Sequence, residues 1–318
     1  MTFFQRKQIN PRTDWIAFEP SGEEMCCVSV VNALEAGAKP QVTSWTTIQD
    51  YAMNEADELM SLTRKLPAKF QRALLLDRAE YKIMVVPEPP VPSDEIDQSL
   101  RWTLGTLLDF PISDASYDWI PIPTRKELPN RPPHLYVIAA RKTDVLGHAD
   151  AFVKAKLPLH AVDIRETAQR NIAALVETPG EGLALVSVVD QGILLTLTWN
   201  GELYLDRFIQ EPLLRMLNGD ADGIEESMDR IATEVQRSIQ HLGRMLPFIH
   251  IGRLVVAPLP APLPLQQHLQ ELLSIPVDKL DLSRVFDFSQ APELLDEHNQ
   301  SRAFGVLGAA LRGMAVSA

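Results

Sequence analysis

Three neighbouring segments decide the fold: Leu183-Ala-Leu-Val-Ser-Val-Val189, Ile193-Leu-Leu-Thr-Leu-Thr198 and Leu203-Tyr-Leu-Asp-Arg-Phe-Ile209. All three are rich in residues that favour β-strands. Short polar turns separate them, and the second turn contains Asn200-Gly201, a pair typical of the tight type I′ turn of a hairpin. The sequence therefore predicts a three-stranded antiparallel meander over residues 183–209.

A long amphipathic helix is predicted after this meander. Apolar residues recur there at spacings of three and four for about six turns, at Ile224, Met228, Ile231, Val235, Ile239, Leu242 and Leu246. This period places them on one face, with a polar face opposite.

The N-terminal third contains a looser copy of the same unit. We expect strands at Trp15–Phe18, Met25–Val31 and Gln41–Thr47, followed by a helix from about Asp50 to Leu66 that Pro67 ends. A meander followed by a helix thus occurs twice, about 170 residues apart. This repetition indicates an internal duplication.

A small α+β module is predicted between the two copies. We expect a hairpin of Arg72–Leu76 and Tyr81–Val86, a helix over 94–109 capped by Ser93, and strands at Tyr117–Ile122 and Leu135–Ala140. The remaining predicted elements are a helix at Asp163–Val176, a strand at Leu254–Ala257 and helices at Leu265–Leu273 and Ala303–Met314.

Composition narrows the classes of function. The chain has 318 residues, of which 46% are hydrophobic and 23% charged, so it can bury a sizeable core. The net charge of −12 argues against nucleic-acid binding, which needs basic surface. There is no signal peptide, no run of apolar residues long enough to span a membrane, and no cysteine besides the adjacent Cys26 and Cys27. We therefore expect a cytoplasmic protein.

Familiar catalytic motifs are missing. The sequence contains no P-loop, no Gly-x-Gly-x-x-Gly and no Gly-x-Ser-x-Gly. The seven histidines are scattered and none falls at a metal-binding spacing, so no metal ligand is predicted.

Several segments together resemble a known family, the PilM-like type IV pilus biogenesis proteins of the actin-like ATPase superfamily. The closer resemblance is to the relative MshI, from mannose-sensitive haemagglutinin (MSHA) pili. The segments are Tyr81-Lys-Ile-Met-Val-Val-Pro-Glu-Pro-Pro-Val-Pro-Ser-Asp-Glu95 with Leu100-Arg-Trp102 and Asp118, Asp163-Ile-Arg-Glu-Thr-Ala-Gln-Arg-Asn-Ile172, Glu234-Val-Gln-Arg-Ser-Ile239 and Gly305-Val-Leu-Gly-Ala-Ala-Leu-Arg312.

The resemblance implies a mixed α/β, two-lobed actin-like fold, which is a ribonuclease H-like fold duplicated. Lobe 1 would span 1–158 and include the module at about 71–142, and lobe 2 would span 159–290. Residues 291–318 would return as a helix to lobe 1. In this family nucleotide binds in the cleft between the lobes, where hairpin turns with an acid and a glycine hold phosphate.

All three loops that should hold nucleotide depart from the family pattern. The first has Glu19-Pro-Ser-Gly-Glu-Glu24, and Cys26 or its neighbour stands where a basic residue is expected. Carboxylates repel phosphate, and proline has no N–H to offer it. The second has Ser187-Val-Val189, or Asp190-Gln-Gly192 if the register slides, and the third has Ala257-Pro-Leu-Pro-Ala-Pro262 in place of paired glycines. We therefore expect a pseudo-ATPase with no cofactor and no catalytic residue.

If ATP and Mg²⁺ do bind, the resemblance implies which residues would contact them. Glu234, Arg237 and Ser238 lie on the polar face of the long helix, where related folds contact adenosine, and Asp190 and Gly192 would meet the phosphates. The alternative is that Glu234 and Arg237 form a solvated ion pair.

Trp102 is the candidate for partner binding. It projects about 180° from the apolar face of the predicted helix 94–109 and therefore needs a second surface to cover it. One interpretation is packing between the module and the main domain. The other is a docking surface for a partner peptide, because Trp is enriched in interface hot spots.

The expected function is that of a non-catalytic adaptor on the inner-membrane platform of a type IV (MSHA) pilus. The resemblance implies as partners the cytoplasmic tail of a bitopic, PilN-like membrane protein and the pilus assembly ATPase. Two alternatives stay open: an ATP-binding switch in the same machine, and the cytoplasmic domain of a GspL-like component of type II secretion.

Overall fold

The computed structural model describes residues 13–22, 24–33, 37–48, 59–60, 66–124 and 132–313. Its first sheet has the strand order β3-β2-β1-β4-β8. The strands are β1 (Trp15–Ser21), β2 (Glu24–Val31), β3 (Gln41–Ile48), β4 (Gln71–Leu75) and β8 (Ala161–Asp163). The first three form the predicted antiparallel meander, and β4 runs parallel to both β1 and β8.

The second sheet repeats this arrangement with the order β11-β10-β9-β12-β13. Its strands are β9 (Gly182–Val189), β10 (Gly192–Trp199), β11 (Glu202–Ile209), β12 (Ile251–Val256) and β13 (Val277–Lys279). Asn200 and Gly201 both have positive φ, as a type I′ turn requires. The internal duplication and the mixed α/β, two-lobed actin-like fold are therefore confirmed.

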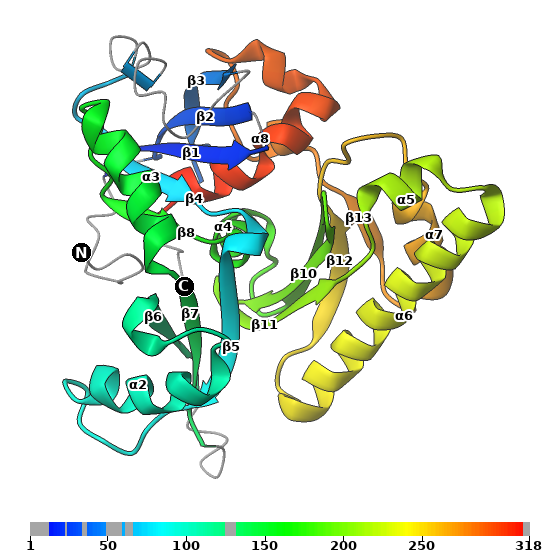
Figure 1. Cartoon of the computed structure of the whole chain (residues 1–318). Coiled ribbons are helices and arrows are strands. Elements are labelled where there is room, and N and C mark those ends of the chain that lie inside the picture. The colour runs from blue at the N-terminus through cyan, green and yellow to red at the C-terminus, as the bar shows by residue number, and fades with distance from the viewer. Residues whose placement is uncertain are drawn as a thin grey trace.

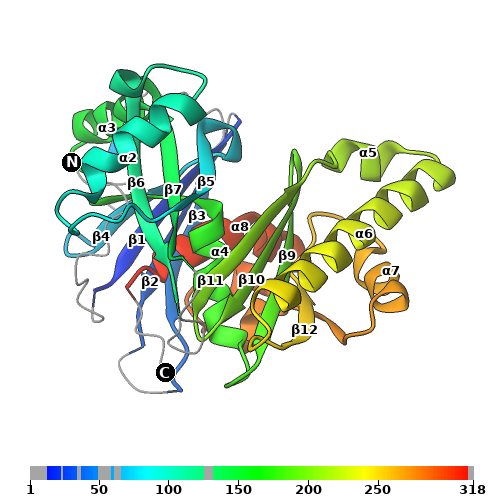
Figure 2. The same cartoon turned by 90° about the horizontal axis from the view of Figure 1, so that it is seen from below.

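Helices cover both faces of each sheet (Figures 1 and 2). On lobe 1, α3 (Lys142–Lys154) packs on one face and α8 (Glu297–Ala310) on the other. On lobe 2, α4 (Arg165–Val176) packs on the inner face, while α6 (Ala221–Met245) and α7 (Leu265–Leu272) lie outside. The remaining short helices are α5 (Leu213–Asn218) and the 3-10 turns Arg78–Glu80, Ile112–Asp114, Leu282–Arg284 and Pro292–Leu295.

The two lobes meet where α4 crosses α8. A Cβ at Gly308 would overlap the carbonyl of Ala168, so the two helices touch backbone to backbone at this point. The side-chain amide of Asn171 donates to the carbonyl of Gly308 (2.9 Å), and Arg312 pairs with Asp163 (2.8 Å). This close crossing fixes the distance between the lobes.

The inserted module is a three-stranded antiparallel sheet in the order β5-β7-β6, covered by α2 (Ile96–Leu107). Its strands are β5 (Tyr81–Pro87), β6 (Ala115–Ile122) and β7 (His134–Arg141). The predicted hairpin of residues 72–76 with 81–86 is wrong. Gln71–Leu75 belongs to the sheet of lobe 1, because its apolar residues pack in that core, and only Tyr81–Pro87 enters the module.

Helix predictions differ in accuracy. Ser93 does not cap α2, because residues 93–95 form a turn and the helix begins at Ile96. Ile96, Leu100 and Leu104 form the buried face of α2, and Leu107 in its last turn is exposed. The helix predicted from Asp50 to Leu66 lies almost wholly outside the described residues. No helix in the described part of the chain is long and apolar enough to cross a membrane.

Candidate functional site

A cavity of about 160 Å³ lies between the lobes, at the ends of the first hairpin of each lobe. It is lined by the first turn of lobe 1, the turn between β9 and β10, the start of α4, the middle of α8 and the proline loop that follows β12. This is the place where the resemblance implies a nucleotide. Sites for cofactor-sized ligands are commonly roughly 300–1,000 Å³, so the cavity is small for ATP.

An ion pair closes the inner end of this cavity. Arg165, at the start of α4, places Nη2 2.5 Å from Oε1 of Glu19, the first acid of the lobe 1 turn. Glu19 is only 4% exposed. Burial raises the pKa of its carboxyl, and Arg165 partly offsets that rise by favouring the charged form. Gly305 on α8 makes room for this carboxylate, since a Cβ there would lie 2.8 Å from Oε2 of Glu19.

A second ion pair lies nearer the outside. Arg302 of α8 places Nη2 2.5 Å from Oε2 of Glu24, at the start of β2. Both side chains line the cavity and both are partly exposed. Arg165 and Arg302 are the two described basic residues that line the cavity, and each pairs with a carboxylate of the same chain. These carboxylates occupy the positions to which the two guanidinium groups would otherwise attract a bound anion.

Side-chain hydrogen bonds hold the floor of the cavity on the lobe 2 side. Gln169 of α4 donates to the carbonyl of Leu185 (2.8 Å) and to Oγ1 of Thr196 (3.0 Å), and accepts from Oγ of Ser187 (2.6 Å). The amide group is buried, and both its nitrogen and its oxygen form hydrogen bonds. Gln169 therefore fixes α4 against β9 and β10.

The other two loops offer few groups to a phosphate. Asp190 lines the cavity and adds a third carboxylate. Gly192 lies in β10 against the carbonyl of Ile209, where there is no room for a Cβ. A glycine is therefore needed at this position for the packing of the strands. In the third loop, Pro258 and Pro260 line the cavity and neither has an N–H to donate. These loops do not match the phosphate cradle that the resemblance implies.

The predicted adenosine contacts lie elsewhere. Glu234 pairs with Arg207 of β11 (2.8 Å) and with Arg237 (2.9 Å), and these partners lower the pKa of its carboxyl. The hydroxyl of Ser238 donates to the carbonyl of Glu234 (2.7 Å). None of Glu234, Arg237 and Ser238 lines the cavity, and the ion pair weighed as the alternative is present.

A second buried ionic group connects the cavity to the base of the module. Tyr81, the first residue of β5, donates its hydroxyl to Oε2 of Glu166 (2.6 Å), and Arg78 places Nε 3.2 Å from Oε1 of the same carboxylate. The hydroxyl of Tyr81 also accepts from the backbone N–H of Arg165 (3.3 Å). Burial raises the pKa of Glu166. Asp206 of β11 lies close by, and burial together with Glu166 raises its pKa to about 7.

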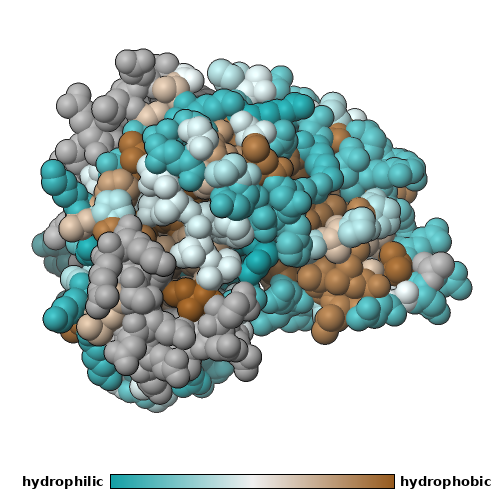
Figure 3. All heavy atoms as spheres, turned by 90° about the horizontal axis from the view of Figure 1, so that it is seen from above, coloured by the Kyte–Doolittle hydropathy of each residue, from teal (hydrophilic) through white to brown (hydrophobic). Residues whose placement is uncertain are grey.

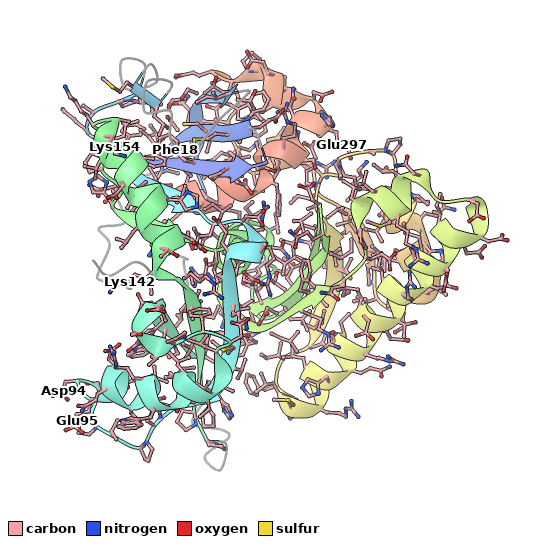
Figure 4. The ribbon with its side chains drawn as sticks, viewed as in Figure 1. Phe18, Asp94, Glu95, Lys142, Lys154 and Glu297 are labelled. Atoms are coloured by element: carbon pink, nitrogen blue, oxygen red, sulfur yellow. The ribbon has the colours of Figure 1, made fainter. Side chains whose placement is uncertain are left out.

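Trp102 is 81% exposed on the outer side of α2. The interpretation that it packs between the module and the main domain is therefore wrong. At Gly105, one turn further on, an added Cβ would meet no described atom within 4 Å. Figure 4 shows Asp94 and Glu95 at the outer end of this module, away from the lobes. Trp102 lies in the middle of α2, about two turns after these acids, which stand in the turn before the helix.

Sequence reasoning missed Arg165 and Arg302, although both stand in or near segments that carry the resemblance. One signal was present. Arg165 is the first residue of α4, where the helix dipole disfavours a cation, so a specific acidic partner was to be expected. Within the described residues, no group of three or more His, Cys, Asp or Glu could hold a metal ion.

Comparison with known proteins rests on structure alone, because no protein-family model and no curated protein matches the sequence. The chain is similar to a chain of the solved PilM–PilN type IV pilus biogenesis complex, with 17% identity and a TM-score of 0.71 over 96% of this chain and 100% of that one. The cytoplasmic domain of EpsL, an inner-membrane component of the type II secretion system of Vibrio cholerae, gives 11% identity and a TM-score of 0.47 over 78% and 84%. The first likeness establishes a shared fold.

Proposed function

We propose that the protein is a non-catalytic cytoplasmic adaptor of a type IV pilus, of the MSHA (MshI-like) kind, that holds the cytoplasmic tail of a bitopic inner-membrane protein. The observation that carries the proposal is the Glu19–Arg165 ion pair, because it fills the inner end of the cleft with groups of the chain itself. Because these charges are paired within the chain, the cleft can keep its structure without a bound nucleotide. The shared fold with a chain of the PilM–PilN complex supports the choice of machine.

Charge and exposure support the choice of partner. The cytoplasmic segments next to membrane spans are rich in Lys and Arg. The outer end of the module carries exposed Asp94, Glu95 and Asp97, and the exposed indole of Trp102 lies further along the same helix. Such a surface attracts a basic tail and gives its apolar residues an aromatic anchor.

Cross-linking from membrane extract tests the proposal. The full chain serves as bait, and Trp102→Ala is the matched variant with an unchanged core. We expect the wild-type chain to enrich one bitopic inner-membrane protein, with cross-links between its cytoplasmic tail and the module, and Trp102→Ala to lose most of them. Equal cross-linking by both chains, or cross-links only to lobe 2, would contradict the proposed surface.

An ATP-binding switch is the second candidate, and one observation favours it. Arg165 and Arg302 bring two guanidinium groups into the cleft, and phosphate is a strong competitor for guanidinium. This candidate requires ATP to displace Glu19 and Glu24 from their partners, so it predicts that nucleotide binding depends on both arginines.

A further inference from the structure

A second surface, on lobe 2, presents apolar side chains to solvent. Helix α5 follows β11 and packs beside α6. Its residues Leu214 and Leu217 are 70% and 41% exposed, whereas Met216 is buried. Figure 3 shows an apolar area on the lobe 2 side of the molecule, where α5 lies.

An ionic network holds α5 in this orientation. Glu211, which is 2% exposed, pairs with Arg230 of α6 (2.6 Å) and accepts from the hydroxyl of Ser227 (2.7 Å). Arg215 of α5 reaches Glu226 of α6 (3.1 Å) and approaches Glu211 (3.7 Å). A helix of six residues is not stable by itself, so these contacts impose its orientation. Leu214 and Leu217 face solvent because the ion pairs of Arg215 hold the opposite side of α5 against α6.

The apolar surface continues to the mouth of the cleft. Leu213 lines the cavity together with Val188 and Val189 from the end of β9. The backbone N–H of Leu213 donates to the carbonyl of Asp190 (3.1 Å), which fixes α5 beside that turn. We call these apolar residues the α5 patch: Val188, Val189, Leu213, Leu214 and Leu217.

Acidic residues border the α5 patch. Asp190 flanks it on one side, and Asp220 and Asp222 follow α5 on the other, all of them exposed. The nearby basic residues, Arg215 and Arg230, are engaged by Glu211 and Glu226. The border is therefore negative, and the occupant that complements it has apolar side chains flanked by Lys or Arg.

The same charge argues against two other occupants. A second copy joined about a twofold axis would place two acidic borders opposite each other. An anionic membrane surface would likewise be repelled. We infer that the α5 patch is a docking surface for a basic amphipathic segment of another protein, on a different lobe from Trp102. The adaptor would then join two proteins.

Calorimetry on the full chain tests this with a short synthetic amphipathic peptide of leucine and lysine. We expect measurable binding that Leu214→Ser/Leu217→Ser weakens about tenfold or more. Asp220→Asn/Asp222→Asn should weaken it severalfold and flatten its salt dependence, since Asn keeps the helix cap that Asp220 provides. Leu272→Ser, at an exposed leucine of α7, is the matched control and should leave the affinity unchanged.

Several outcomes would overturn the inference. An unchanged affinity in the double serine variant, or an equal loss in Leu272→Ser, would remove the α5 patch from binding. Equally tight binding of the matched leucine and glutamate peptide would contradict the charge argument. Self-association of the wild-type chain, or binding to phosphatidylglycerol vesicles, that disappears in the double serine variant would assign the patch to a second copy or to lipid. Because the changed side chains are exposed, all variants should melt at the wild-type temperature.

Discussion

Arg165 and Glu166 are neighbours in the chain, yet their side chains enter two different parts of the molecule. Arg165 pairs with Glu19 in the cleft at 2.5 Å, and Glu166 accepts from Tyr81 at the base of the module at 2.6 Å. The first turn of α4 therefore touches both the cleft and the inserted module. A change in the charge of the cleft has a direct structural route to the module.

Removing the guanidinium of Arg165 should destabilise the protein strongly. Arg165→Ala leaves the Glu19 carboxylate buried and unpaired, which costs about 3 kcal/mol of the free energy of unfolding at neutral pH. Arg237→Ala, which removes an exposed ion pair on α6, should cost less than about 1 kcal/mol. Urea unfolding measures both, and equal losses would show that the cleft pair is no more important than a surface pair.

Asp206, which lies beside Glu166 near the base of the module, should make the free energy of unfolding depend on pH. The pKa of Asp206 is raised from 3.8 to about 7 in the folded chain, so the folded state holds a proton that unfolding releases. The contribution of this group to stability is therefore present below pH 4 and is lost as the pH rises from about 4 to 7. Asparagine does not ionise, so Asp206→Asn abolishes this loss of stability. At pH 8 the free energy of unfolding of the variant should exceed that of the wild type by an amount on the order of 2 kcal/mol.

Chemical denaturation across pH 4–8 checks this prediction. The quantity to compare is the free energy of unfolding of Asp206→Asn minus that of the wild type, because the titration of all other groups cancels in this difference. The difference should grow as the pH rises. A constant difference, or one that shrinks, would show that Asp206 titrates at its ordinary pKa.

Two glycines in helices should respond in opposite ways to alanine. Gly308→Ala pushes α4 from α8, because the added Cβ overlaps the carbonyl of Ala168, and should cost about 1–3 kcal/mol. Gly105→Ala on α2 adds a Cβ with no described atom within 4 Å and should stabilise by about 0.5–1 kcal/mol. Thermal unfolding should thus move the two melting temperatures in opposite directions. A neutral Gly308→Ala would mean that the helices do not touch as described.

The exposed indole should contribute to binding and leave folding unaffected. Trp102→Ala should weaken binding of the partner tail by more than about 1 kcal/mol and leave the melting temperature unchanged. Leu146→Ala, at an exposed position of α3, is the control. A lowered melting temperature with unchanged affinity would show that Trp102 has a structural role.

Local patterns predicted the repeated parts of the fold well. The strands around Asn200-Gly201 and the helix from Ile224 to Leu246 were clear because alternation, turn chemistry and helical spacing agree there. Helix α3 was missed because its apolar spacing is weak, and α5 because it is short and its leucines face outward. The strand Gln71–Leu75 was placed in the wrong sheet, since pairing between distant strands leaves no mark in a local pattern.

The site was predicted only in part. The acids of the first turn and the prolines of the third loop were identified from sequence, and the structure places Glu19, Glu24 and Pro258 around one cavity. Their partners Arg165 and Arg302 lie far away in the sequence and are brought in by two crossing helices. Glu234 was grouped with the cavity on resemblance alone, but its position on α6 places it with Arg207.

We propose that the cleft is closed by the chain's own charges and does not take nucleotide. Isothermal titration calorimetry of the full chain with ATP and Mg²⁺ tests it most directly, with Arg165→Ala/Arg302→Ala as the paired variant. We predict no saturable heat from either protein at ATP concentrations up to the millimolar range. Saturable micromolar binding by the wild type would contradict the proposal, and its loss in the double variant would assign that binding to the cleft.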